Sequence, residues 1–221
     1  NPLSSIGLNA ELLEEELRAG HDFDRAEARE LLEAIGAEVE RLRQVTEIYL
    51  NRARRAPLDQ QRLDLGQLVG RLVDFARSEL EQRQVTPRVD CPEDAHAEID
   101  GSMVRQALWN LVRNGWEAMP GGGTLWLEVQ SQPADAAEGG SPWLVIAVED
   151  SGAGIADEAR PRLFEPFFTT KEAGTGVGLA LVAEVATAHG GRVIVADPRH
   201  GDGARFELWL PERALASPST V

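Results

Sequence analysis

The chain has 221 residues and a formal net charge of −15, with 43% hydrophobic and 27% charged residues, which is typical of a folded globular protein. The acidic excess excludes nucleic-acid binding through a broad basic surface, because phosphate backbones favour basic faces. The single cysteine, Cys91, excludes an internal disulfide, and no apolar run approaches the ~18 residues of a membrane span. We therefore expect a cytoplasmic protein, attached to a membrane only through residues outside this chain if at all.

Two amphipathic helices are predicted at the start of the chain. Apolar residues recur three and four positions apart over residues 3–17 and again over 32–49, which is the spacing of helices packed in a bundle. Gly20 is expected to end the first helix and Pro57 the second. Two helices joined by a short loop form an antiparallel hairpin, which buries its apolar stripes best against a second copy. The pattern over residues 1–56 therefore predicts a helical hairpin that dimerises into a four-helix bundle.

After Pro57 the pattern changes to shorter helices and strands. Helical patterns cover 63–80, 100–119 and 178–190, and extended patterns cover 84–92, 124–130, 143–150 and two segments within 192–211. This order predicts, for residues 57–212, an α/β sandwich with a mixed sheet on one side and helices on the other. The polar segment 131–142 is expected to be a surface excursion, and residues 213–221 a frayed tail.

The segment VEDSGAGI places a carboxylate, Asp150, at the end of a predicted strand, followed by Gly152 and Gly154. A carboxylate in that position favours a hydrogen-bond donor as its partner, and the exocyclic amine of a purine is a suitable donor. The structural alternative is that Asp150 bonds to the backbone of its own turn.

Two further segments suggest a phosphate site. NLVRN places Asn110 and Asn114 on one face of a helix, where their amide oxygens suit Mg²⁺ or are satisfied core groups. Gly174, Gly176 and Gly178 precede a helix whose free N–H groups favour phosphate, although helix packing also explains them. Their spacing matches neither of the two familiar glycine-rich phosphate motifs.

In this order, NLVRN, DSGAGI, LFEPFFTTK and GTGVGLAL resemble the N, G1, F and G2 boxes of bacterial sensor histidine kinases, over residues 58–211. The preceding hairpin resembles their dimerisation and phosphotransfer domain, and NPLSSIGLNAEL is similar to the latter part of their H box. The Thr-Thr-Lys form of the F box is most similar to the nitrogen-regulator type of these kinases.

The resemblance implies a Bergerat-fold site for ATP and Mg²⁺. Asp150 would accept the adenine amine, Asn114 would bind Mg²⁺ with Asn110 beside it, and residues 155–173 would form a lid. Lys171 would reach the γ-phosphate. The lid would be anchored by the buried rings of Phe164, Phe167 and Phe168. The implied nucleotide site comprises Asn110, Asn114, Asp150, Gly152, Gly154, Ile155, Phe164, Phe168, Thr169, Thr170, Lys171, Gly174, Thr175, Gly176, Val177, Gly178 and Leu179.

The sequence departs from the family pattern at two places. Gly115 stands where the family more often has alanine, and we expect it to let Trp116 or the nucleotide approach closely. The phosphoacceptor histidine is expected four residues before Asn1, outside the chain as given. Structural roles are predicted for the histidines within the chain, which are His21, His96, His189 and His200. In relatives, the residue at the place of Asn1 orients a water for phosphatase action.

These observations predict a homodimeric histidine kinase core that transfers the γ-phosphoryl group of ATP to a histidine, and then to an aspartate on the receiver domain of a response regulator. A second hypothesis is an ATPase of the gyrase, mismatch-repair and heat-shock chaperone type. Those enzymes resemble one another in carrying a glutamate near the place of Asn110, and an amide cannot take a proton from water. A third is a degenerate kinase that docks partners through its hairpin.

Overall fold

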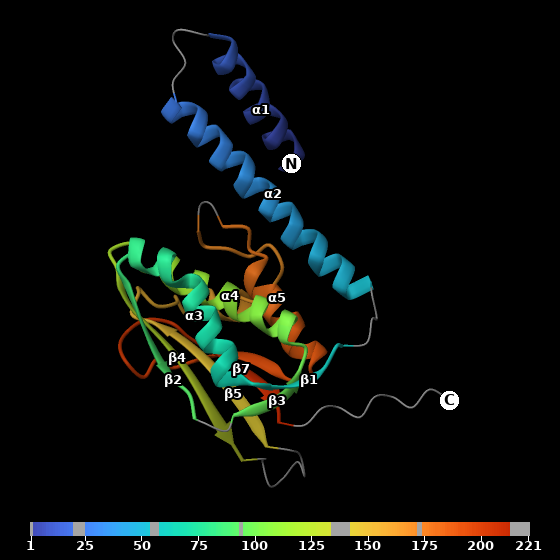
Figure 1. Ribbon diagram of the computed structural model, residues 1–221, viewed down its shortest axis with the longest axis vertical. Coiled ribbons are helices and arrows are strands. Elements are labelled where there is room, and N and C mark those ends of the chain that lie inside the picture. Colours follow the sequence, from blue (N-terminus) through green and yellow to red (C-terminus); the bar gives the residue numbers. More distant parts are fainter. Residues whose placement is uncertain are drawn as a thin grey trace. The chain divides into compact units, whose positions relative to one another are not determined.

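The computed structural model describes residues 2–19, 25–53, 58–92, 95–133, 142–171 and 174–212. The chain divides into two compact units, Asn1–Ala56 and Pro57–Val221, which we call the hairpin unit and the sheet unit (Figure 1). The predictions for Asn1, His21, residues 134–141 and the tail 213–221 lie outside the described residues.

The hairpin unit consists of two helices, α1 (Pro2–Ala19) and α2 (Arg25–Ala53), which confirms the two helices predicted from the heptad spacing. The helix α1 packs against the first part of the longer α2 (Figure 1). Exposed ion pairs join residues that lie one helical turn apart, such as Arg18 and Glu14, whose charged atoms are 2.7 Å apart. Large apolar side chains also remain exposed on the hairpin: Leu8, Leu12, Leu17, Leu32 and Val39. None of the described helices is long and apolar enough to cross a membrane.

A five-stranded mixed sheet forms one layer of the sheet unit. Its strands lie in the order β2 (Val85–Asp90), β4 (Gly123–Gln132), β5 (Trp143–Asp150), β7 (Arg205–Pro211) and β6 (Arg192–Ala196). The pair β2–β4 is parallel and the other three pairs are antiparallel. Three helices, α3 (Leu65–Gln82), α4 (Gly101–Glu117) and α5 (Gly178–Ala188), cover one face (Figure 1). The predicted mixed sheet with helices on one side is confirmed.

A second, two-stranded sheet was missed by the sequence patterns. It pairs β1 (Gln61–Asp64) with β3 (His96–Ile99) in antiparallel fashion. Four residues are too few to show a clear alternation. The helix expected from residue 63 begins at Leu65, because the Asp64 carboxylate caps it and accepts a hydrogen bond from Gln67 N at 3.1 Å.

Alternation along the strands divides the sheet into two chemically different faces. Leu127, Ile146 and Leu208 are fully buried under the helices. On the opposite face the guanidinium of Arg205, 1% exposed, bonds to three carboxylates. We call this group the Arg205 cluster; its carboxylates belong to Glu128, Glu149 and Glu207, each within 3.0 Å of a guanidinium nitrogen.

His189 joins the end of α5 to the start of α4. It is 1% exposed; Asp100 N donates to its Nε2 at 3.0 Å, and its Nδ1 lies 2.8 Å from Val185 O. A ring nitrogen that accepts a hydrogen bond carries no proton, so the folded chain holds the neutral ring. Burial holds the pKa of His189 below its usual range, although the Val185 carbonyl and the Asp100 charge oppose this effect.

We therefore expect the free energy of unfolding to fall as the pH drops below the usual histidine pKa of 6.5. Below pH 6.5 the unfolded chain takes up a proton at His189, whereas the folded chain resists protonation. The contribution of the neutral ring to stability is therefore complete above that pH and is lost on acidification. Urea unfolding over a pH series measures the slope. His189→Gln should reduce this slope. Identical slopes in the wild type and His189→Gln would contradict this account.

Candidate functional site

Asp150 ends β5 beneath the helices and is 5% exposed. Its Oδ1 accepts hydrogen bonds from Gly152 N at 2.8 Å and Ala204 N at 3.3 Å. Within the described part of the chain, no donor reaches Oδ2. Burial raises the pKa of Asp150, against the lowering effect of the two N–H groups and of Lys171. The carboxylate therefore bonds to its own turn, as the structural alternative foresaw, and still has one oxygen for a ligand.

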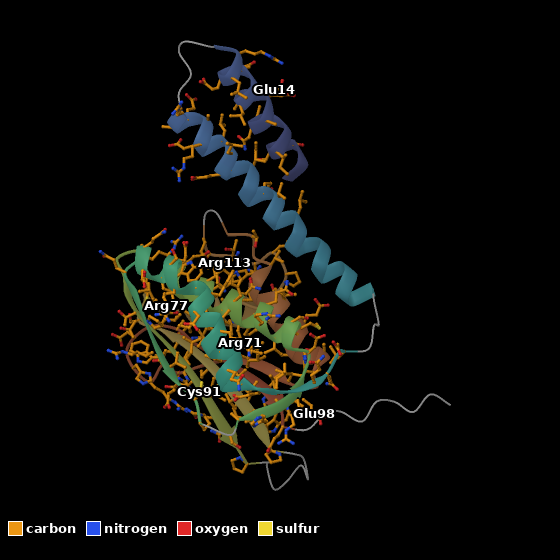
Figure 2. The ribbon with its side chains drawn as sticks, in the orientation of Figure 1. Glu14, Arg71, Arg77, Cys91, Glu98 and Arg113 are labelled. Atoms are coloured by element: carbon orange, nitrogen blue, oxygen red, sulfur yellow. The ribbon has the colours of Figure 1, made fainter. Side chains whose placement is uncertain are left out.

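The two asparagines occupy different environments on α4. Asn110 is 3% exposed; its Nδ2 donates to Gln106 O at 3.0 Å, and Arg113, labelled in Figure 2, donates to its Oδ1 at 3.5 Å. Asn114 is half-buried, and its Oδ1 lies 3.4 Å from Lys171 Nζ. One amide is thus a satisfied core group, and the other presents its oxygen to a cation.

Glu117 is a neighbour of this site that the sequence patterns did not single out. It lies one helical turn after Asn114, and its Oε2 is 2.6 Å from Lys171 Nζ. Its Oε1 lies 3.6 Å from Arg113 Nε. The spacing of three from Asn114 was the available signal, because residues three apart share a helix face.

The glycine-rich entrance leads directly into α5. The helix is preceded by Val177, whose side chain makes no capping bond, so the first N–H groups remain available to an anion. Gly178 opens the helix beside Asn110: a Cβ there would lie 3.0 Å from Asn110 Oδ1. The start of α5 therefore adjoins the face of α4 that carries the two asparagines.

The predicted lid is described from Ile155 to Lys171 and contains one helical turn, η2 (Arg160–Arg162). The ring of Phe164 meets Phe206 of β7 edge to face at 6.4 Å, and the Arg162 guanidinium lies 4.4 Å from the centre of the Phe168 ring. Both rings are half-buried.

The prediction that Phe167 buries its ring is wrong, because this residue is 55% exposed. Its φ of 69° lies in the left-handed region, which a residue with a Cβ rarely adopts. Its backbone makes the contact instead, since Phe167 N donates to Gly176 O at 2.8 Å. Phe167 thus joins the lid to the glycine entrance through the main chain.

The expectation that Gly115 makes room for the nucleotide also needs correction. A Cβ at Gly115 would lie 2.5 Å from Leu125 Cδ1 and 3.6 Å from Asp150 Cβ. The missing side chain thus makes room for the sheet beneath α4, and it brings the helix against Asp150. The space beside Gly115 is therefore filled by the sheet and is not open to a ligand.

The remaining predicted residues line the lid and the entrance. Thr169 Oγ1 accepts a hydrogen bond from Lys171 N at 3.1 Å, and Thr175 Oγ1 accepts one from Val177 N at 3.4 Å. Val177 is fully buried and Thr170 is exposed. The half-buried members are Gly152, Gly154, Ile155, Gly174, Thr175 and Leu179. No group of three or more His, Cys, Asp or Glu side chains suited to a metal occurs among the described residues.

Gly176→Ala is expected to disturb the entrance. Its φ of 65° lies in the left-handed region, which costs a residue with a Cβ roughly 1–2 kcal/mol. The new Cβ would also lie 2.7 Å from Phe167 Cα, so the lid must move away. We expect lower thermal stability and weaker binding of any ligand at the start of α5. Gly121→Ala is the control, because a Cβ there meets nothing within 4 Å; equal effects of the two changes would contradict this prediction.

Taken together, α4 is the element on which the site converges. Gly115 brings it against Asp150, Gly178 brings the start of α5 against Asn110, and Lys171 of the predicted lid reaches Asn114. A buried carboxylate, an amide oxygen, a lysine and a helix start therefore surround one region of the sheet unit. Such a set can bind a ligand that carries a hydrogen-bond donor at one end and negative charge at the other.

Comparison with known proteins gives consistent matches over this region. Residues 99–214, just over half of the chain, match the family model described as "Histidine kinase-, DNA gyrase B-, and HSP90-like ATPase". The sensor histidine kinase ZraS of Salmonella typhi is 33% identical over 212 residues, which are 96% of this chain and 43% of that protein. The nitrogen regulation protein NtrY of Azorhizobium caulinodans is 30% identical over 219 residues, 95% of this chain and 27% of that protein.

The chain therefore spans less than half the length of these relatives. Among solved structures, full-length ShkA in complex with AMPPNP superposes with a TM-score of 0.70 at 22% identity, over 99% of this chain and 47% of that chain. At this identity the likeness shows the fold alone.

Proposed function

Because the chain belongs to the histidine kinase-, DNA gyrase B- and HSP90-like ATPase family, with bacterial sensor histidine kinases among its relatives, we propose that residues 57–212 are the ATP-binding domain of such a kinase. The sheet unit has the Bergerat-type fold of this family. The single observation that carries the proposal is the convergence of Asp150, Asn114, Lys171 and the start of α5 on one site.

In this proposal the site binds ATP from the adenine end to the phosphate end. Asp150 accepts the adenine amine through Oδ2, and the turn at Gly152 and Gly154 forms the floor. The phosphates face the N–H groups at the start of α5, where the helix dipole favours negative charge. Lys171 moves from Glu117 to the γ-phosphate, which offers it a stronger partner than a half-exposed carboxylate. ShkA, solved with the nucleotide analogue AMPPNP, supports the choice of ligand.

The residues at the phosphate end are suited to Mg²⁺. Asn114 Oδ1 already faces the ammonium group of Lys171, and Glu117 supplies a second hard oxygen beside it. Asn114 would hold the ion with the nucleotide phosphates, and the ion would neutralise phosphate charge. Asn110 stays in the core and supports the helix face from which Asn114 projects.

The reaction we propose is transfer of the γ-phosphoryl group to a histidine, and from there to an aspartate of a response-regulator receiver domain. Residues 1–56 would form the dimerisation and phosphotransfer hairpin, with the acceptor histidine four residues before Asn1. The exposed side chains Leu8, Leu12, Leu17, Leu32 and Val39 support pairing with a second copy into a four-helix bundle. Asn1 is proposed to orient a water for dephosphorylation of the regulator.

An amide at position 110 favours this kinase over an ATPase that activates water directly. Asn110 donates to Gln106 O and accepts from Arg113, and an amide does not accept a proton at neutral pH. Slow turnover of ATP in the absence of an acceptor histidine is therefore expected.

Two measurements test the proposal. Calorimetry of the chain with Mg-ATP should show binding at a single site. A version extended N-terminally through the expected histidine, incubated with Mg²⁺ and ATP labelled in the γ-phosphate, should acquire a label that is labile in acid and stable in base. No binding of Mg-ATP would overturn the proposal. Binding together with rapid release of free phosphate, and no label on the protein, would favour the ATPase.

A further inference from the structure

One segment of backbone connects the Arg205 cluster to the proposed adenine site. Glu149 and Asp150 are consecutive in β5 and point to opposite faces of the sheet. Residues 199–204, which we call the strap, hydrogen-bond to both. Glu149 Oε1 accepts from Arg199 N at 2.9 Å and from His200 N at 2.6 Å. At the other end of the strap, Ala204 N donates to Asp150 Oδ1 at 3.3 Å, and Asp150 N donates to Ala204 O at 3.0 Å.

Glu149, which holds the first end of the strap, is buried and charged. The Glu149 side chain is 0% exposed, and its Oε2 lies 2.9 Å from Arg205 Nη1. Burial acts to raise the pKa of Glu149, but the N–H groups of Arg199 and His200 and the Arg205 guanidinium outweigh it and lower that pKa. The carboxylate is therefore ionised at neutral pH, and each of its oxygens is held by a charge-assisted bond.

The far end of the strap fits against Asp150 without spare room. A Cβ at Gly203 would overlap the carbonyl oxygen of Asp150 and lie 2.9 Å from its Oδ1. Across the turn, a Cβ at Gly154 would lie 2.6 Å from Asp202 O. A displacement of the strap must therefore move Ala204 N relative to Asp150 Oδ1, because no gap exists to absorb it.

We propose that Glu149 is a positioning residue that sets the base preference of the nucleotide site. By fixing the strap, it keeps Ala204 N–H on Asp150 Oδ1 and leaves Oδ2 to accept from the ligand. An amino group on the base then gains a hydrogen bond, whereas an oxo group at the same place meets a carboxylate and is repelled. Glu149 acts through the strap and does not touch the ligand. The inference rests on the proposed function, since both concern one pocket.

Glu149→Gln tests the inference, and Glu207→Gln is its matched control. Glu207 is also buried and bonds to Arg205 at 3.0 Å, but its bonds among the described residues go to Arg205 and Trp209 and not to the strap. Calorimetry of the whole chain with Mg-ATP and with Mg-GTP measures the preference. Glu149→Gln should weaken ATP binding by about tenfold or more. It should also reduce the ratio of the binding constant for ATP to that for GTP. Glu207→Gln should keep the ratio of the wild type.

The outcomes separate this inference from the proposed function. If the wild type binds ATP but Glu149→Gln keeps the same ATP-to-GTP ratio of binding constants, the inference alone is overturned. The same holds if Glu149→Gln and Glu207→Gln change that ratio equally. A wild type that binds neither nucleotide would overturn the proposed function and the inference with it. Should Glu149→Gln not fold, a glycine inserted between the exposed residues Gly201 and Asp202 lengthens the strap with every side chain kept. It should narrow the ratio in the same way, and an unchanged ratio would again overturn the inference.

Discussion

Asp150→Asn is expected to abolish nucleotide binding and at the same time to stabilise the sheet unit. The amide matches the carboxylate in size, but it turns one acceptor into a donor that faces the adenine amine. Loss of a buried hydrogen bond of this kind weakens binding by about 100-fold or more. Stability should rise because burial raises the pKa of Asp150, which means that the folded chain disfavours the ionised form present at neutral pH.

The stability gained by Asp150→Asn should depend on pH. The cost of ionised Asp150 is absent below its unfolded pKa of 3.8 and grows as the pH rises through the higher folded pKa. The gain in thermal stability of Asp150→Asn should therefore be largest at neutral pH and shrink on acidification. Calorimetry with Mg-ATP and thermal unfolding measure the two effects. Asp74→Asn is the control, because Asp74 lies exposed on α3 and should change neither. An Asp150→Asn protein that binds ATP like the wild type would remove the basis of the proposed site.

Arg205→Met is expected to have the largest effect on stability. Methionine fills a similar volume, but it leaves three carboxylates on the helix-free face without their shared cation. Removing one partner of a buried ion pair typically costs roughly 3–5 kcal/mol, because the remaining charge stays out of water. The cluster holds three such charges, so we expect a loss at the upper end of that range. Since Arg205 follows the strap directly, ATP binding should weaken as well.

Urea unfolding of the whole chain, monitored by tryptophan fluorescence, measures this loss. Arg77→Met is the control: Arg77, labelled in Figure 2, pairs with Asp74 on the exposed side of α3, where an ion pair contributes little. Replacing Glu149 and Glu207 by glutamine in the Arg205→Met protein should restore part of the stability, because fewer buried charges are left unpaired. A midpoint of Arg205→Met equal to that of the wild type would show that the cluster does not stabilise the fold.

The helices and the long strands were predictable because their signals are local. The heptad spacing identified α1 and α2, and the alternation in β4, β5 and β7 is that of strands with one face under helices. The helix at 178–190 follows directly from its apolar run after the glycines. The strands β1 and β3 were not predictable, since four residues carry little periodicity and their pairing joins segments far apart in the chain.

The candidate site was predictable in part, for a similar reason. The four motifs named Asp150, Asn114 and the glycines by residue type and order, and their proposed roles stay predictions. The exposure and the positive φ of Phe167 were not predictable, because neither is favoured by its residue type. The contact of Gly115 with Leu125 was likewise hidden, because it depends on how α4 lies on the sheet.

The sequence by itself determined where the helices and the longer strands form and which residue types stand at their ends, since periodicity and turn residues act over a few positions. Only the tertiary structure decided which of these ends meet. Lys171 pairs with Glu117 across 54 positions, and Arg205 with Glu128 across 77. Such pairs depend on the register of the strands and on how the helices pack on the sheet. Both depend on many apolar contacts between distant residues, so no short segment specifies them.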